Sequence, residues 1–167
     1  MCEVMKQTRE NKELTQKEVS KILGISRSTY AGWENGFETI SLARLNKLCD
    51  YFDISLDYMC GISNTKNYKE NIHNKFSSKI VGNNLKDIRL KHGHTQSKTA
   101  NLIHTNQSNY SRYEREKNII PTSIILDFSK YYKVSIDYLC GKKKDSKIWI
   151  FLFTLKSLRC KLFLSFF

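Results

Sequence analysis

Two short runs of polar side chains lie 80 residues apart. Their residue types and spacing suit hydrogen bonding to the edge of a flat ring system. An Arg guanidinium can donate two parallel hydrogen bonds to the edge of a guanine, whereas Gln and Asn amides suit the edge of an adenine. Each such pair is worth about 1–3 kcal/mol of discrimination between bases. The chemistry indicated is therefore reversible recognition, and the two runs are expected to read different bases. They are Arg27, Ser28 and Thr29, and Gln107, Ser108 and Asn109.

No arrangement typical of catalysis or metal binding accompanies these runs. The four His residues have no ligand spacing with Cys or acidic residues, and there is no nucleophile–base pair, paired carboxylate or phosphate-cradling Gly loop. The five Cys are an odd number without a CxxC pair, so reduced and mostly buried thiols are expected rather than disulfides or zinc ligands. We therefore expect no enzyme activity, no cofactor and no metal.

The chain contains an internal repeat, because a shift of 80 residues aligns 6–61 with 86–141 without gaps. Apolar residues exchange for one another at many of the remaining positions. The repeat predicts a first domain at 1–61, a polar linker at 62–81, a second domain at 82–141 and a tail at 142–167. Identical pairs include Arg9/Arg89, Thr15/Thr95, Gln16/Gln96, Tyr30/Tyr110, Glu34/Glu114, Ser55/Ser135 and Asp57/Asp137.

Each copy has the pattern of five short helices, and no segment is typical of a strand. In the first copy, Thr15 followed by Glu18 forms a capping box at the start of the second helix. Gly24 supplies the left-handed residue that ends this helix, and Ser26 caps the third. Two short helices joined by a tight turn in a small all-helical domain form the helix-turn-helix pattern.

The segment TQKEVSKILGISRSTYAGWENG resembles the core of the phage-repressor/Cro-type (XRE-like) helix-turn-helix family. The endings ISLDYMCG and VSIDYLCG are similar to the last helix of its bacterial members. The resemblance implies an all-α fold with two tandem five-helix lambda-repressor-like domains joined by the linker. It also implies sequence-specific binding of double-stranded DNA by a bacterial or phage-type transcriptional regulator, a repressor.

A recognition helix enters the major groove by its N-terminal end, so the residues after its cap face the bases. This geometry assigns base contacts to the two polar runs. The resemblance implies further that Gln16 and Gln96 bond a phosphate and brace the recognition helix. It also points to position 32 and its counterpart 112 as DNA-facing, where the copies have Gly32 and Arg112.

Other repeated residues are expected to be structural. The aromatic positions Tyr30, Trp33, Tyr110 and Tyr113 have core spacing, and the pair Glu34 and Glu114 is expected to bond within the domains.

The two copies differ in charge and in their turns. The formal net charge is +12, yet residues 1–61 hold 8 Lys or Arg against 9 Asp or Glu, whereas residues 82–141 hold 9 against 5. The second copy is therefore expected to bind phosphates more strongly. In that copy His104 replaces Gly24, where a left-handed turn would strain it. Arg115-Glu116 likewise replaces Asn35-Gly36.

The linker and tail leave alternatives open. A flexible linker would let both domains engage one duplex in direct or inverted orientation, while Ile72, Phe76, Ile80 and Leu85 could instead form a short packing helix. The apolar tail from Ile148 is interrupted by three cations. It could serve in self-association or packing, could touch a membrane, or could be an adventitious extension, and membrane contact is the weakest of these alternatives.

The N-terminus MCEVMKQTRENK has no apolar stretch, so no signal peptide is expected and the protein is expected to be cytoplasmic. A second functional hypothesis is a protein-interaction module, either antitoxin-like or a tail-tethered adaptor. The negative first domain and the apolar tail favour it.

Overall fold

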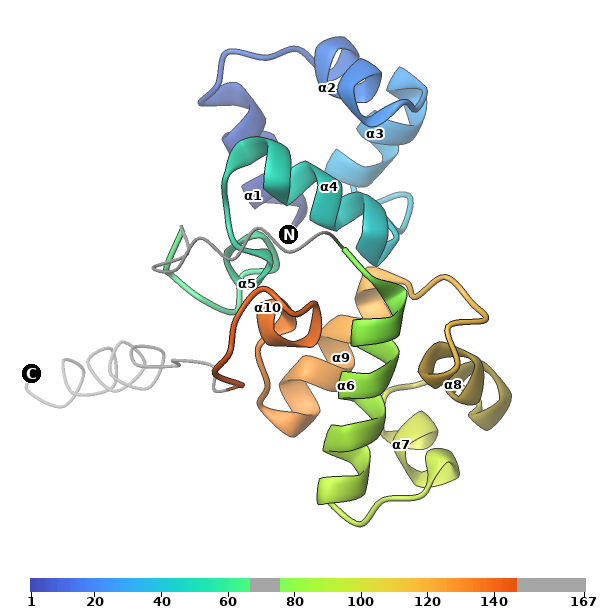
Figure 1. The fold of residues 1–167 in the computed structure, drawn as a ribbon. Coiled ribbons are helices and arrows are strands. Elements are labelled where there is room, and N and C mark those ends of the chain that lie inside the picture. The colour runs from blue at the N-terminus through green and yellow to red at the C-terminus, as the bar shows by residue number, and fades with distance from the viewer. Residues whose placement is uncertain (67–75, 147–167) are drawn as a thin grey trace, which may run out of the picture.

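The computed structural model describes residues 1–66 and 76–146, and these fold into ten α-helices, five in each half (Figure 1). The all-α, tandem five-helix expectation is thus confirmed. The first half contains α1 (Cys2–Glu10), α2 (Gln16–Leu23), α3 (Arg27–Glu34), α4 (Leu42–Phe52) and α5 (Leu56–Met59). The second half contains α6 (Ser78–Lys91), α7 (Gln96–Leu102), α8 (Gln107–Glu114), α9 (Thr122–Tyr132) and α10 (Ile136–Leu139).

Local signals start and stop α2. The Thr15 hydroxyl accepts a hydrogen bond from the Glu18 N–H, and the Glu18 carboxylate accepts one from the Thr15 N–H, completing the predicted capping box. Gly24 ends the helix at φ +69°, a conformation that glycine adopts without the steric cost of a Cβ. An N-cap of this type contributes about 1 kcal/mol to stability.

The second helix-turn-helix pair reaches the same geometry with less suitable residues. Thr95 caps α7 and Asn106 caps α8 through their side-chain oxygens. His104, the counterpart of Gly24, takes the left-handed conformation at φ +56°, and Glu116, the counterpart of Gly36, does so at φ +61°. The turn geometry is therefore retained, and the second copy bears the backbone strain that its sequence predicts.

Aromatic side chains anchor α3 and α8 in the two cores. Tyr30 and Trp33 are 0% and 2% exposed, and Tyr110 and Tyr113 are 0% and 6% exposed, so the prediction of core packing is confirmed. These positions face α1 and α6, which contact α3 and α8 respectively. Burial of one face leaves the opposite face of α3 and of α8 at the surface.

The two halves pack against each other through α4 with α9 and α5 with α10. Figure 1 shows these four helices in the middle of the molecule, with α2–α3 at one end and α7–α8 at the other. Helix α6 begins at Ser78 and therefore includes the last residues of the segment predicted as linker. Ile72 of the proposed linker helix, and the tail from Ile148, lie outside the described residues.

Four cysteines lie in the described ranges, and all four are free thiols. Cys49, Cys60 and Cys140 are buried, as expected, whereas Cys2 is half-buried. Burial raises the pKa of Cys60 to about 12 and also raises the pKa of Cys49 and Cys140. These three thiols are therefore protonated packing groups at neutral pH rather than nucleophiles.

Candidate nucleic-acid interface

The first turn of α3 presents its polar side chains to solvent. Arg27 and Ser28 are exposed, and Thr29 is half-buried. The cap residue Ser26 organises this turn, because its hydroxyl lies 2.8 Å from the Ser28 hydroxyl and 2.9 Å from the Thr29 hydroxyl. Arg27 is therefore the longest exposed hydrogen-bond donor of this turn. It lies next to the Ser28 and Thr29 hydroxyls, which are positioned by Ser26.

The first turn of α8 has the same exposure with different chemistry. Gln107 and Ser108 are exposed and Asn109 is half-buried, while its N–H donates to the cap Asn106 at 2.8 Å. One turn later Arg112 is exposed. The first-turn amides and the Arg112 guanidinium are therefore all accessible on α8, and Asn109 and Arg112 lie one turn apart on the same side.

Position 32 of the first half cannot present an equivalent group. A Cβ on Gly32 would lie 3.1 Å from the Cγ of Glu38, so the Glu38 side chain covers this glycine. The first half thus places a carboxylate near the position at which the second half has Arg112. The exposed arginines of the two helices therefore lie at different positions. Arg27 is at the start of α3, whereas Arg112 is in the second turn of α8.

Glutamines at the start of α2 and α7 brace the recognition helices. The Gln16 amide donates to the Glu34 carboxylate at 2.9 Å, and the Gln96 amide donates to Glu114 at 2.8 Å. Gln107 additionally donates to the Gln96 side-chain oxygen at 3.2 Å. Each glutamine is half-buried, and Gln16 also lines a surface pocket.

A buried ion pair fixes the acceptor of each brace. The Arg9 guanidinium donates to both carboxylate oxygens of Glu34, at 2.7 and 3.1 Å, and Arg89 repeats this on Glu114 at 2.6 and 3.1 Å. Burial raises the pKa of Glu34, but hydrogen bonds from Arg9 and Gln16 outweigh it and hold the pKa below its usual range. The same opposition lowers the pKa of Glu114. Both glutamates therefore bond within their domains, as expected.

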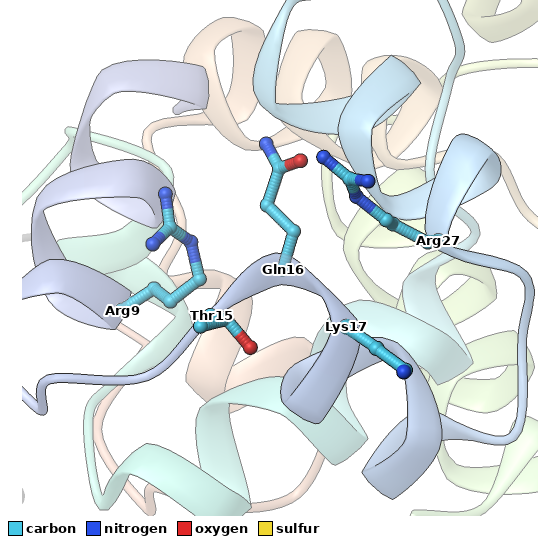
Figure 2. Close-up of a pocket in the computed structure, with 5 residues that line it drawn as sticks. All are labelled: Arg9, Thr15, Gln16, Lys17 and Arg27. Carbon is cyan, nitrogen blue, oxygen red and sulfur yellow. The ribbon is translucent and has the colours of Figure 1, made fainter.

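A surface pocket in the first half is lined by Arg9 and Gln16 together with two further cations, Lys17 and Arg27 (Figure 2). Figure 2 shows the Gln16 amide and the Arg27 guanidinium extending into the space between the starts of α2 and α3. Hydrogen-bond donors and cations around a shared opening fit a phosphate oxygen. The pocket is lined by Arg9, Thr15, Gln16, Lys17 and Arg27.

The second half lacks two of these cations, since Ser97 and Gln107 occupy the positions of Lys17 and Arg27. The first half therefore places Lys17 and Arg27 at this pocket although its summed charge is negative, and the third cation of the pocket, Arg9, is paired with Glu34. Summed charge did not reveal this difference, which depends on where the side chains lie.

The structure brings the predicted residues of each half together beside one recognition helix. Sequence reasoning missed Arg9 and Lys17 as pocket residues and the pairing of Arg9 with Glu34. A signal was present, because Arg9, Gln16 and Glu34 are all identical in the second copy and all meet in space. Identity across a repeat therefore indicated shared contacts before the contacts were known.

Within residues 1–66 and 76–146, no group of His, Cys, Asp or Glu side chains is clustered as metal ligands would be. Among the helices in those ranges, none has the length and apolar character needed to cross a membrane.

Comparison with known proteins gives a match in both halves. A helix-turn-helix family model matches residues 5–59 and again residues 85–139. The HTH-type transcriptional regulator ImmR of Bacillus subtilis (strain 168) is 40% identical over 67 residues, which are 40% of this chain and 53% of ImmR. AnsR of the same organism, also described as an HTH-type transcriptional regulator, is 40% identical over 53 residues, 32% of this chain and 46% of AnsR.

A third relative, the uncharacterized HTH-type transcriptional regulator YqaE of Bacillus subtilis (strain 168), is 35% identical over 69 residues, 41% of this chain and 60% of YqaE. The chain spans about half the length of the curated relatives it matches. No solved structure gave a significant match.

Proposed function

Because the chain belongs to the helix-turn-helix family, in two tandem copies, we propose that it is a sequence-specific, double-stranded DNA-binding transcriptional regulator. It acts as a repressor, occupying an operator and blocking access to the promoter. The relatives named as HTH-type transcriptional regulators support the regulatory role. The protein acts by binding rather than by catalysis, in the cytoplasm.

One observation carries the proposal: each half exposes the polar first turn of a helix whose opposite face is locked into the core. In the first half, Arg27 and Ser28 are exposed while Tyr30 is fully buried. In the second, Gln107 and Ser108 are exposed while Tyr110 is fully buried. A rigid helix with an accessible N-terminal turn fits the major groove.

The residues beside these helices suit the DNA backbone. In the first half, Gln16, Lys17 and Arg27 surround one pocket, and a phosphate there would meet two cations and an amide. Gln96 occupies the equivalent position in the second half, and its side-chain oxygen accepts a hydrogen bond from the Gln107 amide. We assign base contacts to Arg27, Ser28, Thr29, Gln107, Ser108 and Asn109, and backbone contacts to Gln16, Gln96 and Arg112.

Selection from a random duplex pool tests the proposal. The full chain is incubated with the pool, bound duplexes are enriched over several rounds, and affinities are measured at two salt concentrations. We expect an enriched motif and an affinity that falls with salt, since each neutralised phosphate contributes roughly 0.9 to the slope of log K against log salt. An unenriched pool, or an affinity independent of salt, contradicts the proposal.

A further inference from the structure

The backbone contacts between the two halves are reciprocal. The Thr122 N–H donates to the Ile40 carbonyl at 3.1 Å, and the Leu42 N–H donates to the Ile120 carbonyl at 3.0 Å. Positions 120 and 122 align with 40 and 42 in the repeat. Exchanging the halves therefore turns each of these hydrogen bonds into the other.

A second set of contacts, between α5 and α10, obeys the same exchange. The Asp57 carboxylate accepts from the Ile136 N–H at 2.7 Å, and the Asp137 carboxylate accepts from the Leu56 N–H at 2.8 Å. Both aspartates are buried, with exposures of 5% and 2%. Two separate sets of reciprocal contacts define an approximate two-fold axis between the halves, as in an isologous dimer interface.

A two-fold rotation that exchanges the halves also exchanges α3 and α8, so the two recognition helices are inverted relative to each other. Figure 1 shows both on the right-hand side of the view, at opposite ends of the molecule. Two-fold symmetry in a helix-turn-helix protein is mirrored by inverted half-sites on the duplex. A head-to-tail arrangement of the halves would instead require direct repeats.

The half-sites cannot be identical, because the exposed residues of the two helices differ. Arg27 stands where the second half has Gln107, and Gly32 stands where it has Arg112. Some contacts between the halves also have no equivalent when the halves are exchanged. The Lys142 ammonium binds Asp50 across the interface, and the aligned positions 62 and 130 are Ile and Lys. The halves are thus related in geometry but not in the bases they suit.

We propose that this chain is a single-chain pseudo-dimer whose ligand is a duplex with two dissimilar half-sites in inverted orientation, bound by one chain. The inference rests on the proposed function and specifies its substrate. One copy of the chain supplies both recognition helices, so occupancy does not depend on association of two chains. The contacts of Ser41 with Pro121 and of α5 with α10 hold the orientation in the absence of DNA.

The arrangement is tested first with designed duplexes. The two half-sites obtained by selection are assigned to their halves with Arg27→Ala and Asn109→Ala, then placed in inverted or direct orientation at spacings varied by single base pairs. We expect one inverted spacing, near one helical turn, to bind on the order of 100-fold more tightly than any direct arrangement. One chain per duplex is expected in native mass spectra. Equal binding of the two orientations, or two chains per duplex, overturns the proposal.

A disulfide tests the two-fold arrangement without DNA, so its failure is distinguishable from failure of the proposed function. Ser41 and Pro121 form a non-hydrogen-bonded antiparallel pair, in which Cα atoms lie about 4.5 Å apart and suit a disulfide. The double variant Ser41→Cys with Pro121→Cys is expected to form this bond within one chain, as peptide mapping would show. Ser41→Cys alone controls for bonding to the native cysteines.

The oxidised double variant should keep the preference for the inverted duplex, because the bond locks the arrangement that binds. If the 41–121 bond does not form, or if oxidation abolishes the preference while reduction restores it, the two-fold arrangement is overturned. If the bond forms but no duplex is selected, the pseudo-dimer stands as a structure, and the DNA part of the proposal falls with the proposed function.

Discussion

The Cα of Gly82 in α6 lies against the end of α8, where a Cβ would meet the Glu114 carbonyl oxygen at 2.8 Å. This close approach seats the recognition helix of the second half on α6. The aligned residue in the first half is Cys2, at the start of α1. The two halves therefore support their recognition helices differently at this one position.

Gly82→Ala is expected to lower the free energy of unfolding by about 1–3 kcal/mol. The added methyl would press on backbone oxygens, which cannot move like the end of a flexible side chain, and the helical preference of Ala offsets at most about 1 kcal/mol. Urea unfolding measures the change. Asn83→Ala, on the exposed side of the same helix, is the control and should differ little from the parent. A Gly82→Ala variant as stable as Asn83→Ala would contradict the close approach.

Glu34→Gln should lower the free energy of unfolding at pH 7. It should also make that free energy depend less on pH in the acid range. The pKa of Glu34 is lowered in the folded state, so its ionised form stabilises the protein fully above roughly pH 5, and this contribution is lost as pH falls through the lowered pKa. Removing the charge of Glu34 should lower the free energy of unfolding by about 3 kcal/mol at pH 7, because the Arg9 guanidinium stays buried without a charged partner.

Thermal unfolding of the Glu34→Gln variant between pH 2 and pH 7 provides the measurement. The matched control is Glu13→Gln, since Glu13 is exposed and its removal should leave the acid profile unchanged. Parallel acid profiles for the parent and Glu34→Gln would show that the ion pair does not set the acid stability of this half.

His104→Gly should raise the free energy of unfolding by about 0.5–1 kcal/mol. His104 is exposed and held at φ +56°, so glycine relieves strain without losing a packed side chain. The reverse change, Gly24→Ala, is a matched comparison, because a Cβ there meets nothing within 4 Å and only the left-handed backbone opposes it. Chemical unfolding should therefore shift in opposite directions for the two variants, and a shift in the same direction would refute this explanation.

Arg27→Ala and Arg112→Ala should affect DNA binding in different ways. Arg27 lies at the N-terminal turn of α3, so its loss is expected to relax base preference in one half-site by about 1–3 kcal/mol. Arg112 lies one turn further along α8, so its loss should lower affinity for all duplexes and reduce the salt slope by roughly 1.

The aligned exposed lysines of α1 and α6 provide controls on the two arginine variants, since they lie outside both helix-turn-helix pairs. Lys6→Ala controls for loss of a cation in the first half, and Lys86→Ala does so in the second. Binding titrations at several salt concentrations compare all four variants. If an arginine variant behaves like its lysine control, that half is not a reader of DNA.

Much of the fold followed from local patterns in the sequence. Thr15 with Glu18, Gly24 and Ser26 predicted the start, the end and the following cap within a few residues, because capping joins groups that are close along the chain. The repeat then extended these predictions to the second half. The exposed turn of α3 was predictable for the same reason, since Tyr30 at core spacing fixes which side of the helix faces solvent.

The contacts between distant residues were not predictable in the same way. The repeat marked Arg9 and Glu34 as equivalent in both copies, but only packing of α1 on α3 placed them 2.7 Å apart. Summed domain charge also did not predict that Lys17 and Arg27 converge on one pocket, because that depends on which side chains meet when the chain folds.

The sequence by itself determined that this protein has two helical domains, where their recognition helices begin, and which side chains those helices expose. These features depend on hydrogen bonds and apolar periodicity over a few residues. Only the tertiary structure decided that the halves face each other about a two-fold axis, with Asp57 and Asp137 each accepting hydrogen bonds from the other's short helix. Orientation is a relation between surfaces 80 residues apart, and it is set by which buried donors and acceptors meet when the chain packs.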